Sequence, residues 1–548
     1  MAGSLPQCVD TVIIGNGPSA LVLSYILHGH IPYYVGGHHD QLLDQKLRRE
    51  RSLLSLTPDL HDHFLSSIRY STAALPVNTL LDTLLRPNAD TEINPTSCIE
   101  WRYEPERAVS HVAIGDTPQP GGQWVDKPVN ASAKIGTLSY AEQLSLPGYT
   151  YADHMAKGRD AAQCDFVRPS REQVAAYMKA YPDAVGIADA VYTDTKADDI
   201  YRTPKGFVVG SLGIRCKHLV LASGIFTVSI PPPPLLAPVA QMDAEDMPLL
   251  VVGSGFSAAD VIISAPPARK IIHLYQWAPS TRPSPLRGCH HSAYPEYATV
   301  YKQMKLASIS SKKTQSARSP FMRRKSNPFS AQRDWASCYE GFPNAQVLHS
   351  SVSDSTGIAQ VTIRLESGEE ITRQIGGLAY VVGRRGTLDF LSPSLLQELG
   401  PFDTPSGSPT LISGRTLRAR AESSLEVAKN VFIIGSLAGD SLIRHAVGGC
   451  VFAAGRILGA IPSSYPASSS SSPSTPRSAS PNRVSEGTPD SSSTPSPKES
   501  PRESTNGHED LHVDRRKLAR AVEVASVENR IWADSGWWAG GLGWSSAA

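Results

Sequence analysis

Hydrophobic and polar positions along the chain repeat one arrangement three times: a short apolar run, a glycine-containing turn and a segment with helical periodicity. The apolar runs lie at 11–14, 248–252 and 430–434, and the helical segment after the first covers 20–27. A further apolar run at 271–275 follows the second copy at the distance typical of a βαβ unit. Strands that alternate with helices in this way predict an α/β fold with parallel sheets.

The segments between these copies indicate how the units connect. A buried-type strand at 217–224 ends in small residues and is followed by the proline run 231–234, which is typical of an inter-domain connection. A hairpin pattern with strands at 361–365 and 370–374 precedes another apolar run at 378–382. We expect the chain to cross back to the first unit there.

These patterns predict two dinucleotide-binding (Rossmann-like) domains, the second inserted in the first. The expected boundaries are 1–230 and 376–461 for the two parts of the first domain and 231–375 for the second domain. Residues 462–510 are rich in Ser and Pro with little to bury, so we expect a disordered linker. Residues 511–548 regain helical periodicity and carry several tryptophans, and we expect a C-terminal helical segment that docks on the body.

Charge and composition narrow the class of partner. The 52 Lys and Arg residues balance 51 Asp and Glu, so no global field attracts nucleic acid or an anionic membrane. No apolar run approaches the roughly 20 residues that span a bilayer, and no signal peptide is recognised. The seven cysteines lie far apart without a C-x-x-C pair, which indicates a reducing compartment. We therefore expect a cytoplasmic protein that binds a small molecule.

The first two glycine turns suit the phosphates of a dinucleotide. In a G-x-G turn between a strand and a helix, backbone amides approach a pyrophosphate and the helix N-terminus supplies partial positive charge. A single turn of this kind also precedes ordinary helices, but two copies in the same context favour nucleotide binding. The candidate binding residues are Gly15, Gly17, Pro18 and Ser19 in the first turn and Gly253, Ser254, Gly255 and Ser257 in the second.

Two positions around these turns leave alternatives open. The acidic residue expected about 20 positions after the first turn, which holds the ribose hydroxyls, is missing from residues 33–37. Either Asp40 or one of the histidines at 38–39 replaces it, or the adenosine is held differently, and we assign none of these. Arg282 and Arg287 fall where a 2′-phosphate would select NADPH over NADH, although solvated loop arginines are the other interpretation.

Several motifs together resemble the oxidative stress-induced growth inhibitor family, which is related to flavin-containing and N-hydroxylating monooxygenases. The matching segments are Gly15-Asn16-Gly17-Pro18-Ser19, Leu84-Leu85-Arg86-Pro87, Gly121-Gly122-Gln123-Trp124 and Ile434-Gly435-Ser436-Leu437-Ala438-Gly439-Asp440-Ser441. The resemblance covers roughly residues 10 to 460. It implies FAD in the first domain and NADPH in the second.

The same resemblance implies roles for three further residues. Gln123 and Trp124 would lie against the flavin, whereas a plain turn with a core tryptophan is the alternative. Asp440 would contact the ribityl or ring end of the flavin, whereas a surface aspartate that caps the following helix is the alternative.

We therefore expect an FAD-dependent, NADPH-using monooxygenase that transfers oxygen to a small molecule, in a context of secondary metabolism. The alternatives are an NADPH-flavin reductase without oxygen transfer and a regulatory flavoprotein of the growth-inhibitor type. The lack of a close cysteine pair argues against a flavin disulfide reductase. We assign no catalytic residue, because the cofactor carries the difficult chemistry, and we expect no metal. The sequence leaves the substrate and the oligomeric state open.

Overall fold

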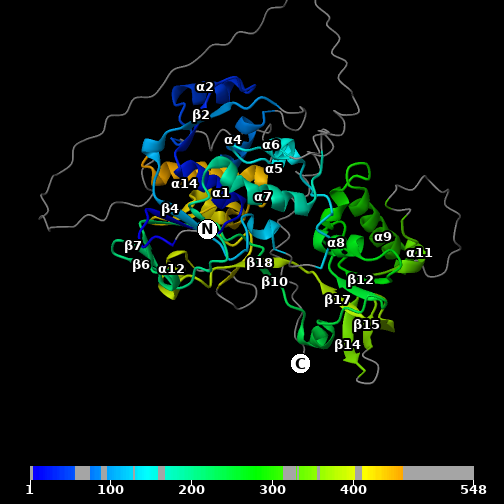
Figure 1. Ribbon diagram of the computed structural model, residues 1–548. Coiled ribbons are helices and arrows are strands. Elements are labelled where there is room, and N and C mark those ends of the chain that lie inside the picture. Colours follow the sequence, from blue (N-terminus) through cyan, green and yellow to red (C-terminus); the bar gives the residue numbers. More distant parts are fainter. Residues whose placement is uncertain are drawn as a thin grey trace, which may run out of the picture.

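The structure, a computed structural model, describes residues 4–55, 74–87, 95–126, 130–157, 167–312, 329, 332–353, 358–400 and 410–460. Within these ranges the chain forms two parts, each built around a parallel sheet (Figure 1). The larger part contains both the first and the last described strands, and the smaller part, green in Figure 1, is formed by the chain between them. This arrangement confirms an α/β fold in which the second unit is inserted in the first.

The larger part is organised by a six-stranded sheet with the order β20-β21-β9-β1-β4-β5. Its strands are β1 (Thr11–Ile14), β4 (His111–Ile114), β5 (Val191–Tyr192), β9 (His218–Leu221), β20 (Glu426–Ala428) and β21 (Val431–Ile433). Neighbouring strands are parallel except for β20 and β21. Every residue of β1 is buried, as expected for a central parallel strand covered on both faces.

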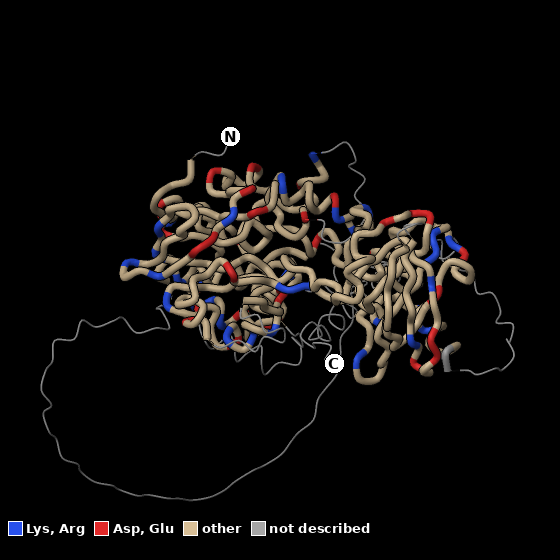
Figure 2. Tube along the Cα trace, turned by 90° about the horizontal axis from the view of Figure 1, so that it is seen from below, with Lys and Arg blue, Asp and Glu red and all other residues tan. Residues whose placement is uncertain are grey.

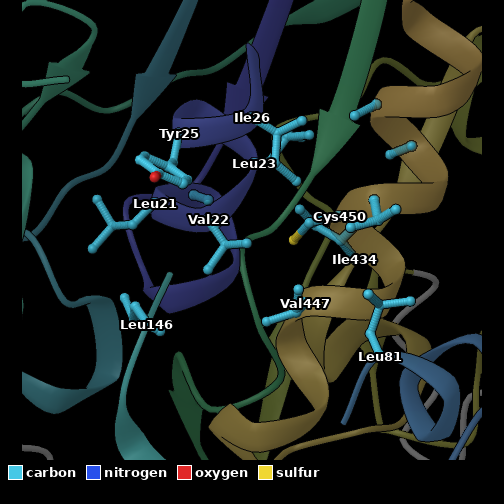
Figure 3. Close-up of a cluster of buried hydrophobic side chains, with 14 of the residues drawn as sticks. Leu21, Val22, Leu23, Tyr25, Ile26, Leu81, Leu146, Ile434, Val447 and Cys450 are labelled. Atoms are coloured by element: carbon cyan, nitrogen blue, oxygen red, sulfur yellow. The ribbon is translucent and has the colours of Figure 1, made fainter. Parts of the chain in front are cut away.

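Helix α1 (Pro18–Leu27) anchors the turn that precedes it. Its residues from Ala20 to Leu27 are all buried, and the helix packs against α14 (Ala446–Ile457). Figure 3 shows the contact, in which side chains of α1 meet Val447 and Cys450 of α14. Each fully buried aliphatic side chain contributes about 1.5–3 kcal/mol. Because this apolar packing fixes α1, it also fixes the position of the first glycine turn.

A long excursion separates α1 from the next strand of the six-stranded sheet. Strand β2 (His30–Tyr34) pairs antiparallel with β3 (Ile99–Tyr103) in a separate two-stranded sheet. Helices α2 (Gln41–Arg49) and α4 (Pro76–Leu85) belong to the same excursion, and α4 packs on α14. The strand that follows α1 in sequence therefore does not lie beside β1, contrary to the ordinary βαβ arrangement.

The smaller part carries a four-stranded parallel sheet with the order β13-β12-β11-β17. Its strands are β11 (Leu249–Val252), β12 (Ile271–Tyr275), β13 (Tyr339–Pro343) and β17 (Gly377–Tyr380). Helices α8 (Phe256–Ser264) and α9 (Pro295–Lys312) pack with it, and the antiparallel strands β14 (Gln346–Val352), β15 (Ala359–Arg364) and β16 (Glu370–Ile375) form a further sheet. The hairpin expected from the alternation at 361–374 is confirmed as β15 and β16.

The chain passes between the two parts twice. Strand β10 (Val228–Ser229) leads out and β18 (Arg384–Thr387) leads back, and the two pair antiparallel. Because β17 belongs to the second sheet, that sheet extends past the expected boundary at residue 375.

Short elements complete both parts. The smaller part also contains α11 (Trp335–Cys338). The remaining elements of the larger part are β6 (Ile200–Thr203), β7 (Gly206–Val209), β8 (Ile214–Cys216), β19 (Leu411–Ile412), α5 (Ala141–Leu144), α6 (Tyr151–Ala156), α7 (Arg171–Val185), α12 (Pro393–Glu398) and α13 (Arg418–Ser423).

Charges of both signs are interspersed along both parts of the described chain (Figure 2). Among the described residues, no helix is long and apolar enough to cross a membrane, and no group of three potential metal ligands comes together. The expected disordered linker at 462–510 and the expected helical segment at 511–548 lie outside the described residues.

Candidate functional site

The first glycine turn has the backbone geometry that only glycine adopts easily. Gly15 has φ +127°, its amide donates to the Ile114 carbonyl at 2.7 Å, and a Cβ at this position would overlap the Ala222 carbonyl oxygen. Gly17 is the N-cap of α1, Pro18 occupies the first helical turn, and within the described chain no side chain caps the helix. The first amides of α1 therefore lie unpaired among the described residues, at the carboxyl edge of the sheet. Free amides at a helix N-terminus attract phosphate groups.

The loop at Gly121 and Gly122 lies directly on this turn. The Gly121 amide donates to the Asn16 carbonyl at 2.9 Å, and a Cβ on Gly122 would lie only 3.1 Å from the Gly17 Cα. A short 3-10 helix (Gly122–Trp124) follows. Arg171 of α7 fixes that helix, because its guanidinium donates to the Gln123 carbonyl at 2.6 Å and to the Trp124 carbonyl at 3.2 Å. The structure thus brings Gln123 and Trp124 beside the first turn.

The third strand-turn-helix copy also meets the first turn. Gly435, with φ +66°, lies against the Ser19 side chain, so that a Cβ there would overlap the Ser19 hydroxyl. The Cys450 thiol of α14 donates to the Ser19 carbonyl at 3.1 Å. Segments far apart in sequence therefore form one wall at the carboxyl edge of the six-stranded sheet, with Ser19 between them.

Asp440 is a buried structural junction. It is only 6% exposed; one carboxylate oxygen accepts from the Leu75 amide at 2.8 Å and from the Asn78 Nδ2 group at 2.6 Å. The other oxygen accepts from Arg418 Nη1 at 2.7 Å. The alternative of a surface aspartate capping the following helix is wrong, because Asp440 is buried and the N-cap of α14 is His445. Asp440 ties α4 and α13 to the loop after β21.

The polar contacts of α4 escaped the sequence reasoning. Asn78 accepts from the Gly449 amide at 2.8 Å in addition to its bond with Asp440, which lies 362 residues away in sequence. Asp82, also on α4, binds Arg86 at 3.1 Å and Arg444 at 2.6 Å. Although burial opposes it, the two guanidinium groups lower the pKa of Asp82 to about 2. No local pattern in the sequence signals partners at such separations.

The second glycine turn repeats the geometry of the first. Gly253 has φ +149°, and a Cβ there would overlap the Val381 carbonyl oxygen of the segment after β17. Gly255 is the N-cap of α8, and a Cβ on it would meet no atom within 4 Å. The Ser254 carbonyl accepts from the Ser284 hydroxyl at 2.6 Å, and Ser257 lies half-buried in the first turn of α8. The four predicted residues of this turn therefore lie together at the carboxyl edge of the second sheet.

Arg282 lies in the loop after β12, one of the two strands beside β11. Its Nη1 group donates to Gln276 at 3.1 Å, and Gln276 directly follows β12. Arg287 donates to the Pro279 carbonyl at 3.0 Å. In a dinucleotide-binding sheet the ribose lies at the end of the strand beside the first one, so Arg282 is in range of that position.

Asp260 carries a partly exposed carboxylate on α8, four residues after Phe256 begins this helix. Burial raises the pKa of Asp260 to about 6, and a hydrogen bond from the Tyr297 hydroxyl at 2.8 Å opposes this shift. Arg171 and Arg168 also oppose the shift, whereas Glu296 adds to it. Arg171 links this region to the first site, because the same side chain holds Gln123 and Trp124.

Unpartnered polar atoms gather around the first turn. Among the described residues, the buried side-chain atoms without a hydrogen bond include Asn16 Nδ2, Trp124 Nε1 and Ser223 Oγ. Asn16 belongs to the turn, Trp124 to the adjoining loop, and Ser223 follows β9, the strand beside β1. Buried polar groups are almost always hydrogen-bonded, so three such atoms at one sheet edge fit a site for a polar ligand. The glycine cradle and these donors fit the diphosphate-linked cofactor FAD.

Comparison with known proteins reveals distant relatives over most of the chain. A scan against models of known protein families finds no match. Human oxidative stress-induced growth inhibitor 2 is 26% identical over 500 residues, covering 80% of this chain and 91% of the relative. Mouse oxidative stress-induced growth inhibitor 1 is 26% identical over 509 residues, covering 84% of this chain and 97% of the relative.

Likenesses to solved structures are weaker. A flavin-containing monooxygenase from Stenotrophomonas maltophilia is 14% identical with a TM-score of 0.43, covering 83% of this chain and 98% of the other. An L-lysine 6-monooxygenase from Pseudomonas syringae is 12% identical with a TM-score of 0.41, covering 83% and 100%.

Proposed function

The chain is a distant member of the oxidative stress-induced growth inhibitor family, and from that premise we propose that it is an FAD-dependent, NADPH-using monooxygenase acting on a small molecule. FAD would bind at Gly15, Gly17, Pro18 and Ser19 with Gln123, Trp124 and Asp440 near it, and NADPH would bind at Gly253, Ser254, Gly255, Ser257 and Arg282. The substrate would lie between the two nucleotides.

One observation carries this proposal. Two G-x-G turns with left-handed first glycines, Gly15 and Gly253, each lie at the carboxyl edge of a parallel sheet and each begin a helix. In α/β sheets this edge is where nucleotides bind, and a helix N-terminus there favours a pyrophosphate. A protein with two such edges, one of them lined by unpartnered polar atoms, suits two nucleotide cofactors.

Each group of residues would have a separate task. When bound, FAD would supply the electron transfer and oxygen chemistry. The first amides of α1 would hold its diphosphate, and the loop from Gly121 to Trp124, fixed by Arg171, would shield it from water. Arg282 would pair with the 2′-phosphate of NADPH. Asp440 would keep α4 and α13 in place around the cofactor.

Two other functions remain as alternatives. An NADPH-flavin reductase would use the same two nucleotide sites and pass electrons to an acceptor without oxygen transfer. A regulatory flavoprotein is favoured by the names of the relatives, which describe growth inhibitors and specify no reaction. Both alternatives share the cofactor sites, so measurement of oxygen and NADPH consumption must separate them.

The test begins with the purified full-length protein and its absorption spectrum. We expect bound FAD, oxidation of NADPH under air, and oxygen uptake that a suitable small molecule stimulates without matching release of peroxide. Absence of flavin together with absence of NADPH oxidation contradicts the enzyme proposal. Reduction of an added acceptor in the absence of oxygen, with no substrate-stimulated oxygen uptake, favours the reductase instead.

A further inference from the structure

The location of the adenosine ribose is the part of the first site that the sequence left unassigned, and this inference rests on the proposed function. The sequence suggested the residues after β2, because β2 follows α1 along the chain. The structure excludes the end of β2 as the ribose site, since β2 pairs antiparallel with β3 in a separate sheet. Its carboxyl end is therefore not part of the nucleotide-binding edge of the six-stranded sheet.

The polar residues that follow β2 are also engaged in local structure. Asp40 is the N-cap of α2, where its carboxylate accepts from the Leu42 amide at 3.1 Å and from the Leu43 amide at 3.2 Å. His38 bonds Thr83 at 3.0 Å through Nε2 and accepts from the Asp40 amide at 3.1 Å through Nδ1. These contacts show that Asp40 and His38 stabilise the segment between α1 and β4 that contains β2 and β3.

Two strands lie beside β1, β9 on one side and β4 on the other. The segment 222–226 after β9 carries no carboxylate, so the acid is sought at the end of β4. Strands β1 and β4 are parallel, with Ile14 opposite Ile114, so the first glycine turn and the segment 115–117 leave the sheet side by side. In a dinucleotide-binding sheet, the residues at the end of this neighbouring strand contact the ribose hydroxyls. The exposed carboxylate there is Asp116.

The Asn16 side chain fills the space beside Gly115, the first residue after β4. A Cβ on Gly115 would overlap the Asn16 side-chain amide, so the space that a side chain at 115 would occupy is filled from the turn itself. Asn16 is 2% exposed; its Oδ1 accepts from the Thr117 hydroxyl at 2.9 Å, and its Nδ2 group has no partner among the described residues. That donor suits a ribose or phosphate oxygen, which are both acceptors.

The segment that carries Asp116 is held firmly on its other side. The Gly115 amide donates to the Tyr192 carbonyl at 3.1 Å, and the Gly115 carbonyl accepts from the Thr195 amide at 2.9 Å. The Thr117 carbonyl accepts from the Asp194 amide at 2.9 Å. Backbone bonds on both sides of residue 116 fix the start of its side chain while the carboxylate stays exposed.

We propose that the adenosine ribose of the bound FAD lies at the carboxyl end of β4, with its hydroxyls on the Asp116 carboxylate and the Asn16 amide beneath it. The β2–β3 excursion has thus displaced the ribose-binding acid from the strand that follows α1 to a strand much later in the chain. A carboxylate accepts hydrogen bonds from both ribose hydroxyls, which gives it a strong preference for an intact ribose.

The test compares two flavins on two variants of the full-length protein after its flavin has been removed. Asp116→Asn should weaken FAD binding about ten- to a hundredfold, the effect of a lost charge-assisted hydrogen bond. The same variant should bind the 2′,3′-dideoxyadenosine analogue of FAD within about threefold of the wild type, because that analogue lacks the hydroxyls. Asp40→Ser is the matched control; it removes the carboxylate after β2 but keeps an N-cap, so its FAD affinity should not change.

The possible outcomes distinguish a wrong ribose site from a wrong proposed function. Failure of the wild type to bind FAD contradicts the proposed function. If the wild type binds FAD, the inference is overturned when Asp116→Asn binds it equally well, or loses affinity for FAD and the dideoxy analogue alike. Weakening by Asp40→Ser with none by Asp116→Asn also overturns it and returns the ribose to the end of β2. Thermal unfolding of both variants confirms that they are folded, which is expected because Asp116 is exposed.

Discussion

The two glycine turns share a local geometry but differ in the chain that completes each site. In the smaller part, β11, α8 and β12 follow one another, and β12 lies beside β11. In the larger part, β1 and α1 are followed by an excursion, and the strands beside β1 are β9 and β4, which both come later in the chain. The glycine motif therefore marks a helix N-terminus at the carboxyl edge of a sheet, whereas the order of strands in the sheet sets which other residues lie beside it.

Asp440 in the larger part and Asp260 in the smaller part also differ in the contacts that hold them. Asp440 in the larger part accepts from three donors brought together from distant segments. Among the described residues, Asp260 in the smaller part accepts one side-chain hydrogen bond, from Tyr297, and burial raises its pKa to about 6. Asp440 is a junction of the fold, whereas Asp260 is a titratable group on the helix that begins at the second glycine turn.

The largest effect is expected from Asp440→Ala. The substitution leaves Asn78 Nδ2, the Leu75 amide and the Arg418 guanidinium without their shared acceptor, and loss of one partner of a buried ion pair costs about 3–5 kcal/mol. Chemical denaturation should show this loss of stability, together with loss of bound flavin. Asp189→Ala, at an exposed ion pair, should change stability by less than about 1 kcal/mol. Equal stability of both variants would contradict the role of Asp440 as a junction.

A slightly smaller effect is expected from the titration of Asp260. The pKa of this carboxyl is raised from 3.8 to about 6 in the folded protein, so between these pH values the unfolded chain has lost the proton and the folded protein keeps it. Stability should therefore fall by up to about 3 kcal/mol as the pH rises from about 4 to 6 and then remain level. Asp260→Asn keeps an acceptor for Tyr297 and should remove this fall. Denaturation curves at several pH values test it, and an unchanged slope in the variant would count against it.

The matched pair Gly15→Ala and Gly253→Ala tests the turns directly. Each alanine meets positive φ and a carbonyl oxygen, at a cost of about 1–3 kcal/mol in backbone strain. Gly15→Ala should lose flavin, while Gly253→Ala should keep flavin and show a raised KM for NADPH. The flavin to protein ratio and the NADPH kinetics measure the two effects. If both variants lose flavin equally, the division of the cofactors between the turns is wrong.

The smallest effect is expected from Arg282→Gln. Loss of one charged contact to a 2′-phosphate should raise the KM for NADPH about tenfold and leave the KM for NADH unchanged, a difference of about 1.4 kcal/mol. Arg364→Gln, at an exposed arginine of strand β15, is the control and should change neither. Steady-state kinetics with both nucleotides measure the ratio. An equal rise for NADPH and NADH would place Arg282 away from the phosphate.

Elements that depend on a local pattern could be predicted from the sequence. Apolar periodicity and glycine positions act over a few residues, and they were enough to predict these elements. They are the buried strands β1 and β11, the turns at Gly15 and Gly253, the hairpin of β15 and β16, and helix α14. The insertion of the second unit also followed from the order of the apolar runs. The return at 378–382 was predicted too early, because that run is β17 of the second sheet and β18 leads back.

Contacts between segments that are distant in sequence became visible in the tertiary structure alone. The pairing of β2 with β3 places β4 beside β1, and no local pattern indicates this, because strand partners are chosen by long-range packing. The contacts of Asp440 with Asn78 and of Asp82 with Arg444 have the same origin. The ribose-binding acid therefore could not be found by counting residues after the first turn, since that count assumes that the next strand in sequence is the next strand in space.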